Sequence, residues 1–450
     1  MAPRLLVGLD VGTTRIKAVA VDLGGRQLAE AALPTPWRHH GAEADADPIE
    51  LALTAESVLT ALPSATGWPT GARVIGIGVT GMAETGVLLD AAGQVVAPAL
   101  AWHDPRGEVE FIEQHISRAD FHRHVGMRLN SKPSVAKILW LQKNIPGAKT
   151  AVRHLCVAEW IVHHLGGEQV GELSLTSRTG LFDVVTRSPW AQTLRLTGDL
   201  LPNRFVVAGE DCGSVSGGLP DAYRGAVLTV TGMDHQSAAF ASGAAISGAL
   251  FNSLGTAEAL MRFVPAPITR ERLEVLVDQD AAVLWGVIPD HLCVLAATLA
   301  GLSMERVHAL LGIKGREQSR DLAQAALSID RSTSAMKLDP ASHRGLRLSG
   351  IDDESSPALT WRVAVEDLLE QSATMLTFIE GIVGPRTSAV VGGGWIHDAM
   401  VADVKKRQLG DYRVCDVNEP GAVGAALFAG IATGEIKRPG SAERPTWPQA

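Results

Sequence analysis

Residues 5–22 read LLVGLDVGTTRIKAVAVD, and this stretch decides the fold class. Two apolar runs, 5–10 and 15–22, flank a Val-Gly-Thr-Thr turn, which is the pattern of a β-hairpin. The second run is largely apolar on both faces, so we expect its strand to be buried on both sides of a sheet. A glycine turn and a further run over 26–33 predict a third strand, so the chain is expected to begin with a β-meander.

The same plan of strand, Gly-Thr turn and strand returns at residues 248–264, GALFNSLGTAEALMRFV. Gly255 follows Gly12 at a distance of about half the chain, which has 450 residues. Two halves of one architecture would place the two Gly-Thr turns facing each other across a cleft. Because Gly-Thr is a common turn, a chance match is the alternative.

Strands and helices alternate in the rest of the chain, as in an α/β protein. Residues 34–48, rich in proline and charge, are expected to form a loop. The helix over 421–434 is rich in glycine and alanine, and we expect it to pack closely on the strand over 388–394. The other elements expected are strands over 73–81, 85–90 and 226–234, and helices over 49–62, 134–146 and 361–384.

Composition excludes several classes of function. The chain has 40 Lys and Arg against 49 Asp and Glu, a net charge of −9, and no basic block, so we expect no nucleic-acid partner. No apolar run is long enough to span a bilayer, and the N-terminus lacks the pattern of a signal peptide, so we expect no membrane partner. Four scattered cysteines without paired spacing predict a reducing compartment, the cytoplasm.

The turn at Asp10-Val11-Gly12-Thr13-Thr14 is a candidate phosphate site. A turn between two buried strands can direct several backbone N–H groups to one side, which makes an anion-binding concavity. Gly12 would let a phosphate approach the backbone, and Thr13 and Thr14 could add hydroxyl donors. Asp10 could hold a hydrated Mg²⁺, which prefers one or two carboxylates plus phosphates. The alternative is an ordinary hairpin turn capped by Asp10.

Two further stretches have both a functional and a structural interpretation. Asp234 lies at a strand-to-helix junction, where it could take a proton from a hydroxyl, or could simply cap the helix. Gly392, Gly393 and Gly394 follow an apolar strand, where a flat ligand could lie against the backbone. Tight packing of the helix over 421–434 would need no ligand.

Several motifs are rejected. Gly76–Gly81 matches GxGxxG, but a loop and a strand are expected after it, whereas a dinucleotide site requires a helix. The pairs His39-His40 and His163-His164 lack a cysteine or carboxylate at ligand spacing, so a metal site is not expected there. The sequence contains no P-loop and no nucleophile elbow.

In combination, these blocks resemble the FGGY carbohydrate kinase family over residues 5 to 434. The resemblance rests on five segments in order, with Trp102-x-Asp104-x-Arg106 as the most specific part: 7–22, 86–106, 230–244, 250–260, and 390–404 with 419–434. It implies an α/β fold of two actin-like, ribonuclease H-like domains flanking a deep cleft. We expect a sugar-binding domain over 1–243, an ATP-binding domain over 244–436 and a loose tail over 437–450.

The resemblance also implies roles for individual residues. Asp234 would be the general base for the attacking hydroxyl of a small sugar or polyol, and Asp10 would organise Mg²⁺ and the phosphates of ATP. The residues expected to line the nucleotide are Gly12, Thr13, Thr14, Lys17, Gly255, Thr256, Gly392, Gly393 and Gly394. For Lys17, a plain solvated strand residue is the alternative.

Substrate residues are expected around Glu84, which could accept hydrogen bonds from two hydroxyls. Family members with a xylulokinase-like or glycerol kinase-like pattern carry Met-His or Arg-Glu where this chain has Ala83 and Glu84. The other expected substrate contacts are Trp102, which would stack on the sugar, with Asp104, Arg106, His235 and Gln236. A structural salt bridge is the alternative for Arg106.

Two other functions remain open on this sequence. One is a non-catalytic sugar- or nucleotide-binding regulator on the same fold, which departures from the family pattern at 301–305 and 337–362 would favour. The other is a different ATPase of the actin-like superfamily. A homodimer is the oligomeric state considered.

Overall fold

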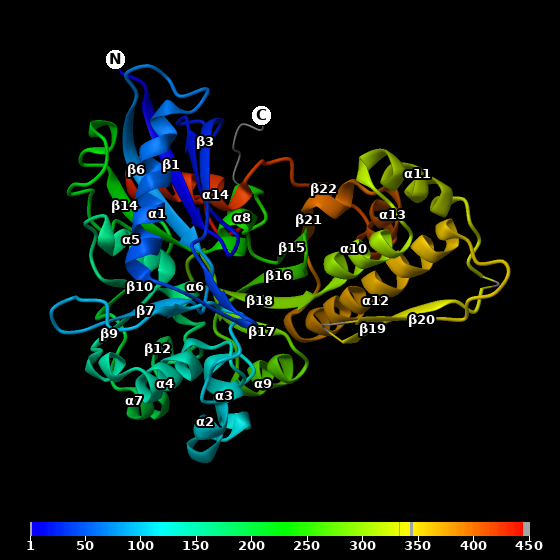
Figure 1. Ribbon diagram of the computed structural model, residues 1–450, viewed down its shortest axis with the longest axis horizontal. Coiled ribbons are helices and arrows are strands. Elements are labelled where there is room, and N and C mark those ends of the chain that lie inside the picture. The colour runs from blue at the N-terminus through cyan, green and yellow to red at the C-terminus, as the bar shows by residue number, and fades with distance from the viewer. Residues whose placement is uncertain (1, 333, 343–344, 444–450) are drawn as a thin grey trace. The chain divides into compact units, whose positions relative to one another are not determined.

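The computed structural model describes residues 2–332, 334–342 and 345–443, and it divides into two compact units, each mixed α/β as expected (Figure 1). The first unit comprises Met1–Ser247, Pro265–Cys293 and Val417–Ala450. The second comprises Gly248–Val264 and Val294–Asp416.

The sheet of the first unit has the strand order β14-β6-β1-β2-β3. Strand β1 pairs antiparallel with β2 and parallel with β6, and this register sets Asp10 opposite Lys17 on one side and Thr80 on the other. The apolar runs are buried as expected, so the predicted meander is confirmed. The bounds are β1 (Arg4–Val11), β2 (Arg15–Val21), β3 (Gln27–Pro34), β6 (Arg73–Gly81) and β14 (Val227–Met233).

The region expected to be a loop at 34–48 instead forms a short hairpin. Strands β4 (Arg38–His40) and β5 (Glu43–Ala46) pair antiparallel, and β5 also pairs with β8 (Ala99–Leu100). Arg38 lies opposite Asp45, and their side chains form an ion pair of 2.8 Å. Strands of two to four residues carry too short a pattern to be read from the sequence.

The first unit contains further helices and short strands. The helices are α1 (Pro48–Ala61), α2 (Val109–His115), α3 (Arg118–Val125), α4 (Ser134–Asn144), α5 (Val157–His164), α6 (Leu173–Thr176), α7 (Ala191–Thr197), α8 (Asp234–Ala241), α9 (Arg270–Asp278) and α14 (Pro420–Ala432), with 3₁₀ turns η1 (Leu62–Ser64), η2 (Pro146–Thr150) and η3 (Asp221–Tyr223). The short strands are β7 (Gly86–Leu89), β9 (Arg153–Cys156), β10 (Val170–Glu172), β11 (Phe182–Asp183), β12 (Ser188–Pro189), β13 (Arg204–Val206) and β17 (Ala282–Trp285).

Helix α14 packs on β1, β6, β14 and α8 of the first unit, which corrects the expectation that it packs on the strand at 388–394. A Cβ on Gly8 would lie 1.7 Å from the carbonyl oxygen of Ala422, and one on Gly78 would lie 1.9 Å from that of Ala425. The helix backbone therefore sits directly on the sheet. The GxGxxG match at residues 76–81 lies within strand β6, and its Gly78 is needed for this close contact with α14. No helix begins at the motif, which agrees with its rejection as a dinucleotide site.

The sheet of the second unit repeats the plan of the first. Strands β15 (Ala249–Leu254) and β16 (Glu258–Pro265) form an antiparallel hairpin, and β15 pairs parallel with β21 (Ser388–Gly392), which pairs parallel with β22 (Arg413–Val414). The predicted second hairpin is thus confirmed. The remaining elements are β18 (His291–Thr298), which spans the division at Cys293, β19 (Lys337–Ser342), β20 (Gly345–Ser349), α10 (Ala300–Leu310), α11 (Gly315–Leu327), α12 (Pro357–Val383), α13 (Ala399–Leu409) and η4 (Gly394–His397).

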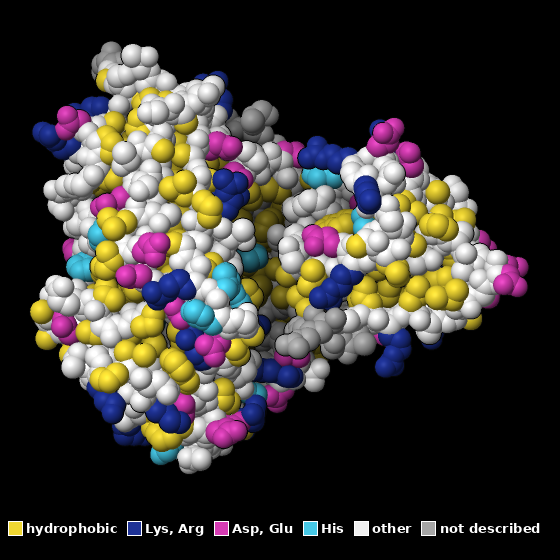
Figure 2. Space-filling model, viewed as in Figure 1, with side chains coloured by type: hydrophobic (Ala, Val, Ile, Leu, Met, Phe, Trp, Pro, Cys, Tyr) yellow, Lys and Arg dark blue, Asp and Glu magenta, His cyan; other side chains and the backbone are white. Residues whose placement is uncertain are grey.

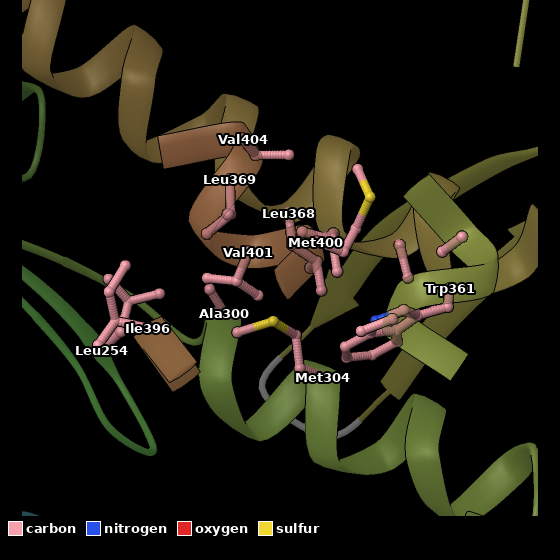
Figure 3. Packing of buried hydrophobic residues seen from close by; sticks show 14 of the residues in the cluster. Leu254, Ala300, Met304, Trp361, Leu368, Leu369, Ile396, Met400, Val401 and Val404 are labelled. Atoms are coloured by element: carbon pink, nitrogen blue, oxygen red, sulfur yellow. The ribbon is translucent and has the colours of Figure 1, made fainter. Parts of the chain in front are cut away.

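The core of the second unit is built around α12. Ser356 caps this helix by accepting a hydrogen bond of 3.2 Å from the N–H of Leu359, and Pro357 occupies its first turn. Trp361 is fully buried and packs with Met304 of α10 and Met400 of α13 (Figure 3). These residues fix the helices against the sheet that carries the second Gly-Thr turn.

The division of the chain into two units differs from the expected one, which had a single boundary between residues 243 and 244. The chain leaves the first unit close to that point, at Ser247, but segments 265–293 and 417–443 return to it. The return of α14 follows from its close packing on the first sheet. Of the tail expected over 437–450, residues 444–450 lie outside the described residues.

On the face drawn in Figure 2, Lys and Arg side chains are interspersed with Asp and Glu, and the described residues there form no continuous basic stripe. Among the helices in the described part of the chain, none is long and apolar enough to cross a membrane.

Candidate active site

Asp10 is a partly buried carboxylate of the first unit with one unpartnered oxygen. It lies at the end of β1, and its Oδ1 is buried without a hydrogen-bond partner among the described residues. A Cβ on Gly421, in the first turn of α14, would lie 2.7 Å from its Oδ2. The carboxylate therefore packs directly on the N-terminus of a helix, whose positive end favours negative charge.

Charged residues from separate segments of the first unit shift the pKa of Asp10. Burial and then the negative charge of Asp234 raise the pKa of Asp10 to about 7, while Lys17 and His235 lower it. Lys17 does not lie free in solvent, because its Nζ bonds both carboxylate oxygens of Glu419 at 2.8 and 2.7 Å. Glu419, just before α14, has a φ of 46°.

Asp234 is the first residue of helix α8. It is not the N-cap of this helix, which was the structural interpretation considered for it; the N-cap is Met233. Its Oδ1 accepts hydrogen bonds from the backbone N–H of His235 at 2.6 Å and from the Nδ1 of the same residue at 2.8 Å. The negative charge of Asp234 raises the pKa of His235, against the effect of burial. Oδ2 accepts no hydrogen bond from the described residues, so it is available to a substrate.

The backbone just before Asp234 is held by hydrogen bonds from α6 and the residue that precedes it. Ser174 Oγ accepts a hydrogen bond of 3.0 Å from the N–H of Met233 and donates one of 2.6 Å to Glu172, which is fully buried. Gly232 has a φ of 80°, which only glycine adopts readily. Sequence patterns gave no sign of Ser174 or Glu172, because they lie far from Asp234 in the chain.

The Gly-Thr turn of the first unit is held by indole groups. The Nε1 of Trp102 donates to Thr13 Oγ1 at 2.9 Å, and that of Trp37 donates to the Thr13 carbonyl at 2.6 Å. Thr35 Oγ1 donates to the carbonyl of Gly12 at 2.7 Å. Trp102, whose stacking on a sugar stays a prediction, thus orders the predicted phosphate turn.

Asp104 and Arg106 form a closed network that favours the structural alternative. Asp104 is fully buried and accepts hydrogen bonds from Arg106 Nε at 2.9 Å and from the N–H of Ala44 at 2.7 Å. Arg106 also bonds Asp45 at 3.0 Å. Burial opposes ionisation of Asp104, but these hydrogen bonds lower its pKa overall. The pair ties the loop before α2 to strand β5 rather than presenting free groups to a substrate.

Gln236, predicted to touch the substrate, is fully buried and bonded to the backbone on both sides. Its Nε2 donates to the Trp285 carbonyl at 3.1 Å, and its Oε1 accepts from the N–H of Val287 at 2.9 Å. One N–H of its amide and its Oε1 are thus held by the backbone, and these two bonds brace α8 against the segment after β17. The burial of Gln236 favours a structural role, and the expected substrate contact stays a prediction.

Glu84, predicted as the hydroxyl acceptor, has a φ of 64° and is buried beside the buried residue Ala83. Its Oε1 accepts a hydrogen bond of 2.7 Å from Arg178 Nε and a second one from Arg178 Nη2. Arg178 was missed by the sequence analysis, because nothing in the run 173–180 marks that arginine as buried.

In the second unit, the Gly-Thr turn rests on helix α10. The N–H of Leu302 donates to the Thr256 carbonyl at 2.7 Å, and a Cβ on Gly301 would lie 1.7 Å from the Gly255 carbonyl oxygen. Gly393, just beyond β21, has a φ of 93°, and a Cβ there would lie 2.2 Å from the carbonyl oxygen of Leu254. The predicted glycines of this unit thus lie around the end of strand β15.

The residues present fit a magnesium ion. The unpartnered, buried Oδ1 of Asp10 is a hard oxygen ligand, and Mg²⁺ usually takes one or two carboxylates together with waters and phosphates. Within the described ranges, no group of three or more His, Cys, Asp and Glu residues could hold a metal ion by itself.

Comparison with known proteins identifies the family and the fold of the chain. Residues 5–241 match the model of the FGGY family of carbohydrate kinases, N-terminal domain. A glycerol kinase from Methylibium petroleiphilum is 30% identical over 272 residues, which cover 56% of this chain and 52% of that protein. An L-fuculokinase from Salmonella typhi is 26% identical over 490 aligned positions, which cover 100% of this chain and 98% of that protein.

Solved structures share the fold at lower sequence identity. A xylulose kinase from Rhodospirillum rubrum superimposes with a TM-score of 0.83 at 19% identity, over 96% of this chain and 92% of that one. A glycerol kinase from Plasmodium falciparum with ADP gives a TM-score of 0.83 at 18% identity, over 97% and 91%. Because the family model covers more than half of the sequence, the chain belongs to the FGGY family of carbohydrate kinases.

Proposed function

We propose that the protein transfers the γ-phosphoryl group of ATP to a hydroxyl of a small sugar or polyol, with Asp234 as the general base. The observation that carries this proposal is the state of Asp234, which has one oxygen held by His235 and the other without a partner among the described residues. A carboxylate fixed in this way can accept the proton of an attacking hydroxyl.

The partners of Asp234 keep it ready for this step. The bond from His235 to Oδ1 orients the carboxylate, so that Oδ2 is left to take the proton. Ser174 fixes the backbone N–H one residue earlier, which limits motion of the junction. Phosphoryl transfer depends mostly on such positioning and on stabilisation of charge.

On the phosphate side, we assign Gly12, Thr13 and Thr14 to the γ-phosphate and Asp10 to Mg²⁺. Mg²⁺, when bound, neutralises charge that develops on the phosphoryl oxygens. Asp10 is suited to the ion because its Oδ1 lacks a partner and its carboxylate lies at a helix N-terminus. Lys17, held by Glu419, would contribute through its charge rather than as a free donor.

For ATP itself we propose the glycines of the second unit as the binding surface. Gly255 and Thr256 would receive the phosphates, and Gly392, Gly393 and Gly394 would lie against the adenosine. Support comes from the way the turn and the glycines lie around the end of strand β15. A backbone free of Cβ atoms allows a flat ligand to approach closely.

A coupled assay of ADP release tests the proposal, with Mg²⁺, ATP and a panel of ketoses, aldonates and polyols. Turnover that depends on one of these compounds is expected. Folded protein that binds a sugar in calorimetry but turns over none would favour the non-catalytic regulator. ATP hydrolysis that is faster without any sugar would favour a different actin-like ATPase.

A further inference from the structure

A lysine and a glutamate form a buried ion pair in the second unit. The side chains of Lys405 in α13 and Glu258 in β16 are 2% and 0% exposed, and Lys405 Nζ donates a hydrogen bond to Glu258 Oε1. Asn252 Nδ2 of β15 donates to the same oxygen at 3.0 Å, and the lysine also donates to Ser372 Oγ of α12 at 3.2 Å. The pair therefore joins two helices to the β15–β16 hairpin.

Glu258 stands directly at the Gly-Thr turn of this unit. It is the first residue of β16 and pairs with Leu254, the last residue of β15, so the turn over 255–257 closes between them. Asn252 precedes Leu254 by two residues and thus lies on the same face of the hairpin as Glu258. The contacts of the glutamate side chain therefore hold the backbone from which the turn projects.

Helix α13 connects the same ion pair to the glycines at 392–394. The helix follows η4, and Asp398 caps it by accepting hydrogen bonds of 3.0 and 3.1 Å from the N–H groups two and three residues later. Lys405 lies about two turns further along. The two parts of the surface proposed for ATP, the turn and the glycines, are thus joined by a buried ionic contact as well as by the pairing of β15 with β21.

A role in stability alone is the alternative, and the energetics disfavour it. Removal of two charges from water offsets most of their attraction, and apolar side chains of similar volume are often as stabilising or more so. Two further acceptors in the cluster, Glu258 Oε2 and Asn252 Oδ1, are buried without a partner among the described residues, which adds to the cost. A costly polar cluster beside the turn points to a role in its geometry.

We propose that Glu258 and Lys405 are positioning residues of the nucleotide site, which hold the Gly-Thr turn of the second unit in the geometry that receives the phosphates of ATP. Hydrogen bonds to one carboxylate oxygen are directional, whereas apolar attraction is not, so they fix β16 relative to α13 more narrowly than an apolar contact would. The inference rests on the proposed kinase function and assigns to it two residues that touch no substrate.

The variant Lys405→Met tests the lysine. Methionine keeps most of the length of the side chain but leaves Glu258 without its buried counter-charge. We expect kcat/KM for ATP to fall about 10- to 100-fold, since a displacement of about 1 Å in a binding group can cost about 10²-fold, while KM for the sugar changes much less. The matched control is Lys406→Met on the same helix, because Lys406 is 60% exposed and pairs with the fully exposed Asp411.

A double variant, Lys405→Met with Glu258→Gln, separates positioning from stability. No charge is then left buried without a partner, and glutamine keeps an oxygen for the hydrogen bond from Asn252. We expect its melting temperature to exceed that of Lys405→Met and to approach that of wild type, while KM for ATP stays raised. If KM for ATP returns to the wild-type value together with the melting temperature, the pair is only structural and the inference is overturned.

Steady-state kinetics and calorimetry with a non-hydrolysable ATP analogue distinguish the remaining outcomes. Sugar-dependent turnover in wild type, with the same KM for ATP in both Lys405 variants, would overturn the inference and leave the kinase proposal standing. Weaker binding of the analogue by the double variant, in a protein whose wild type turns over no sugar, would support the positioning role and refute the kinase. A wild type that binds no nucleotide would overturn both.

Discussion

The carboxylate of Asp10 packs against Gly421, so closely that a Cβ on the glycine would lie 2.7 Å from Asp10 Oδ2. This contact joins the first hairpin of the chain to a helix that begins more than 400 residues later. The helix reaches the carboxylate because Gly8 and Gly78 let its backbone lie on the sheet. The partly buried Asp10 is thereby placed at the positive end of α14, with its Oδ1 out of contact with water.

Gly421→Ala is expected to impair the reaction through Asp10. The new methyl group cannot share space with Oδ2, so the carboxylate or the helix must move, and a displacement of about 1 Å can cost about 10²-fold in rate. We expect kcat to fall by at least about tenfold, measured by ADP release. Gly217→Ala is the control, because this exposed glycine has no atom within 4 Å of the place that a Cβ would take. Equal activity of the two variants would show that the contact is unimportant.

Asp10→Asn is expected to make the protein more stable at high pH. Burial and the charges of Asp234 and Glu419 outweigh Lys17 and His235, and they raise the pKa of Asp10 from 3.8 to about 7. The folded state thus holds the proton more tightly than the unfolded chain, so stability is lost as pH rises through that window. Asparagine removes this loss. We expect the melting temperature of the variant to exceed that of wild type at pH 8, and the difference to shrink towards pH 4.

Differential scanning calorimetry in the absence of nucleotide and Mg²⁺ gives these melting temperatures. Asp221→Asn, at a carboxylate that is 89% exposed, serves as control and is expected to show no such pH dependence. A variant that melts below wild type at pH 8 by as much as at pH 4 would contradict the electrostatic account of Asp10.

The sequence alone predicted the hairpins and the main helices well, because each is encoded by a local pattern. The apolar runs on both sides of Gly12 and of Gly255 need no distant partner to be recognised. The position of α14 was not predictable in this way. Its small residues indicate close packing, but only the structure shows that they meet Gly8 and Gly78 of the first sheet.

The same distinction applies to the candidate site: some of its residues follow local patterns, and others are positioned by contacts with distant segments. Asp10 and Asp234 lie at the ends of strands with a recognisable pattern, whereas Arg178 gains its position from hydrogen bonds of Ser174 and Ser177 to segments about 60 and 110 residues away. Gln236 shows the converse, because its adjacency to Asp234 favoured a substrate contact, whereas the structure shows its amide bonded to the backbone on both sides. Sequence spacing indicates which residues are near in the chain, but not which polar groups are already satisfied.

Gly301→Ala is expected to weaken ATP binding with little effect on the first unit. A Cβ at this position of α10 would lie 1.7 Å from the carbonyl oxygen of Gly255 and 2.9 Å from that of Thr256. Relief of such overlap typically costs about 1–3 kcal/mol and would shift the turn proposed to hold the phosphates. We expect KM for ATP to rise and KM for the sugar to change less.

The matched control in the same unit is Gly381→Ala. This glycine lies on α12, is exposed and has no atom near the position of a Cβ, so alanine is expected to stabilise the helix by about 1 kcal/mol. Steady-state kinetics with ATP varied at saturating sugar distinguishes the two variants. If both leave KM for ATP unchanged, the second Gly-Thr turn is not part of the nucleotide site.

Asp234→Asn is expected to abolish most of the turnover and to spare binding. Asparagine keeps the size of the side chain and an oxygen for the hydrogen bonds from His235, but it cannot accept the proton of the substrate hydroxyl. A general base contributes about 10²–10⁴-fold, so kcat should fall by that factor. Calorimetry should show binding of nucleotide close to that of wild type, since Asp234 is not among the residues proposed to contact the nucleotide. A variant that loses binding of ATP and sugar together with activity would point to a collapsed site instead, and one that retains kcat would exclude Asp234 as the base.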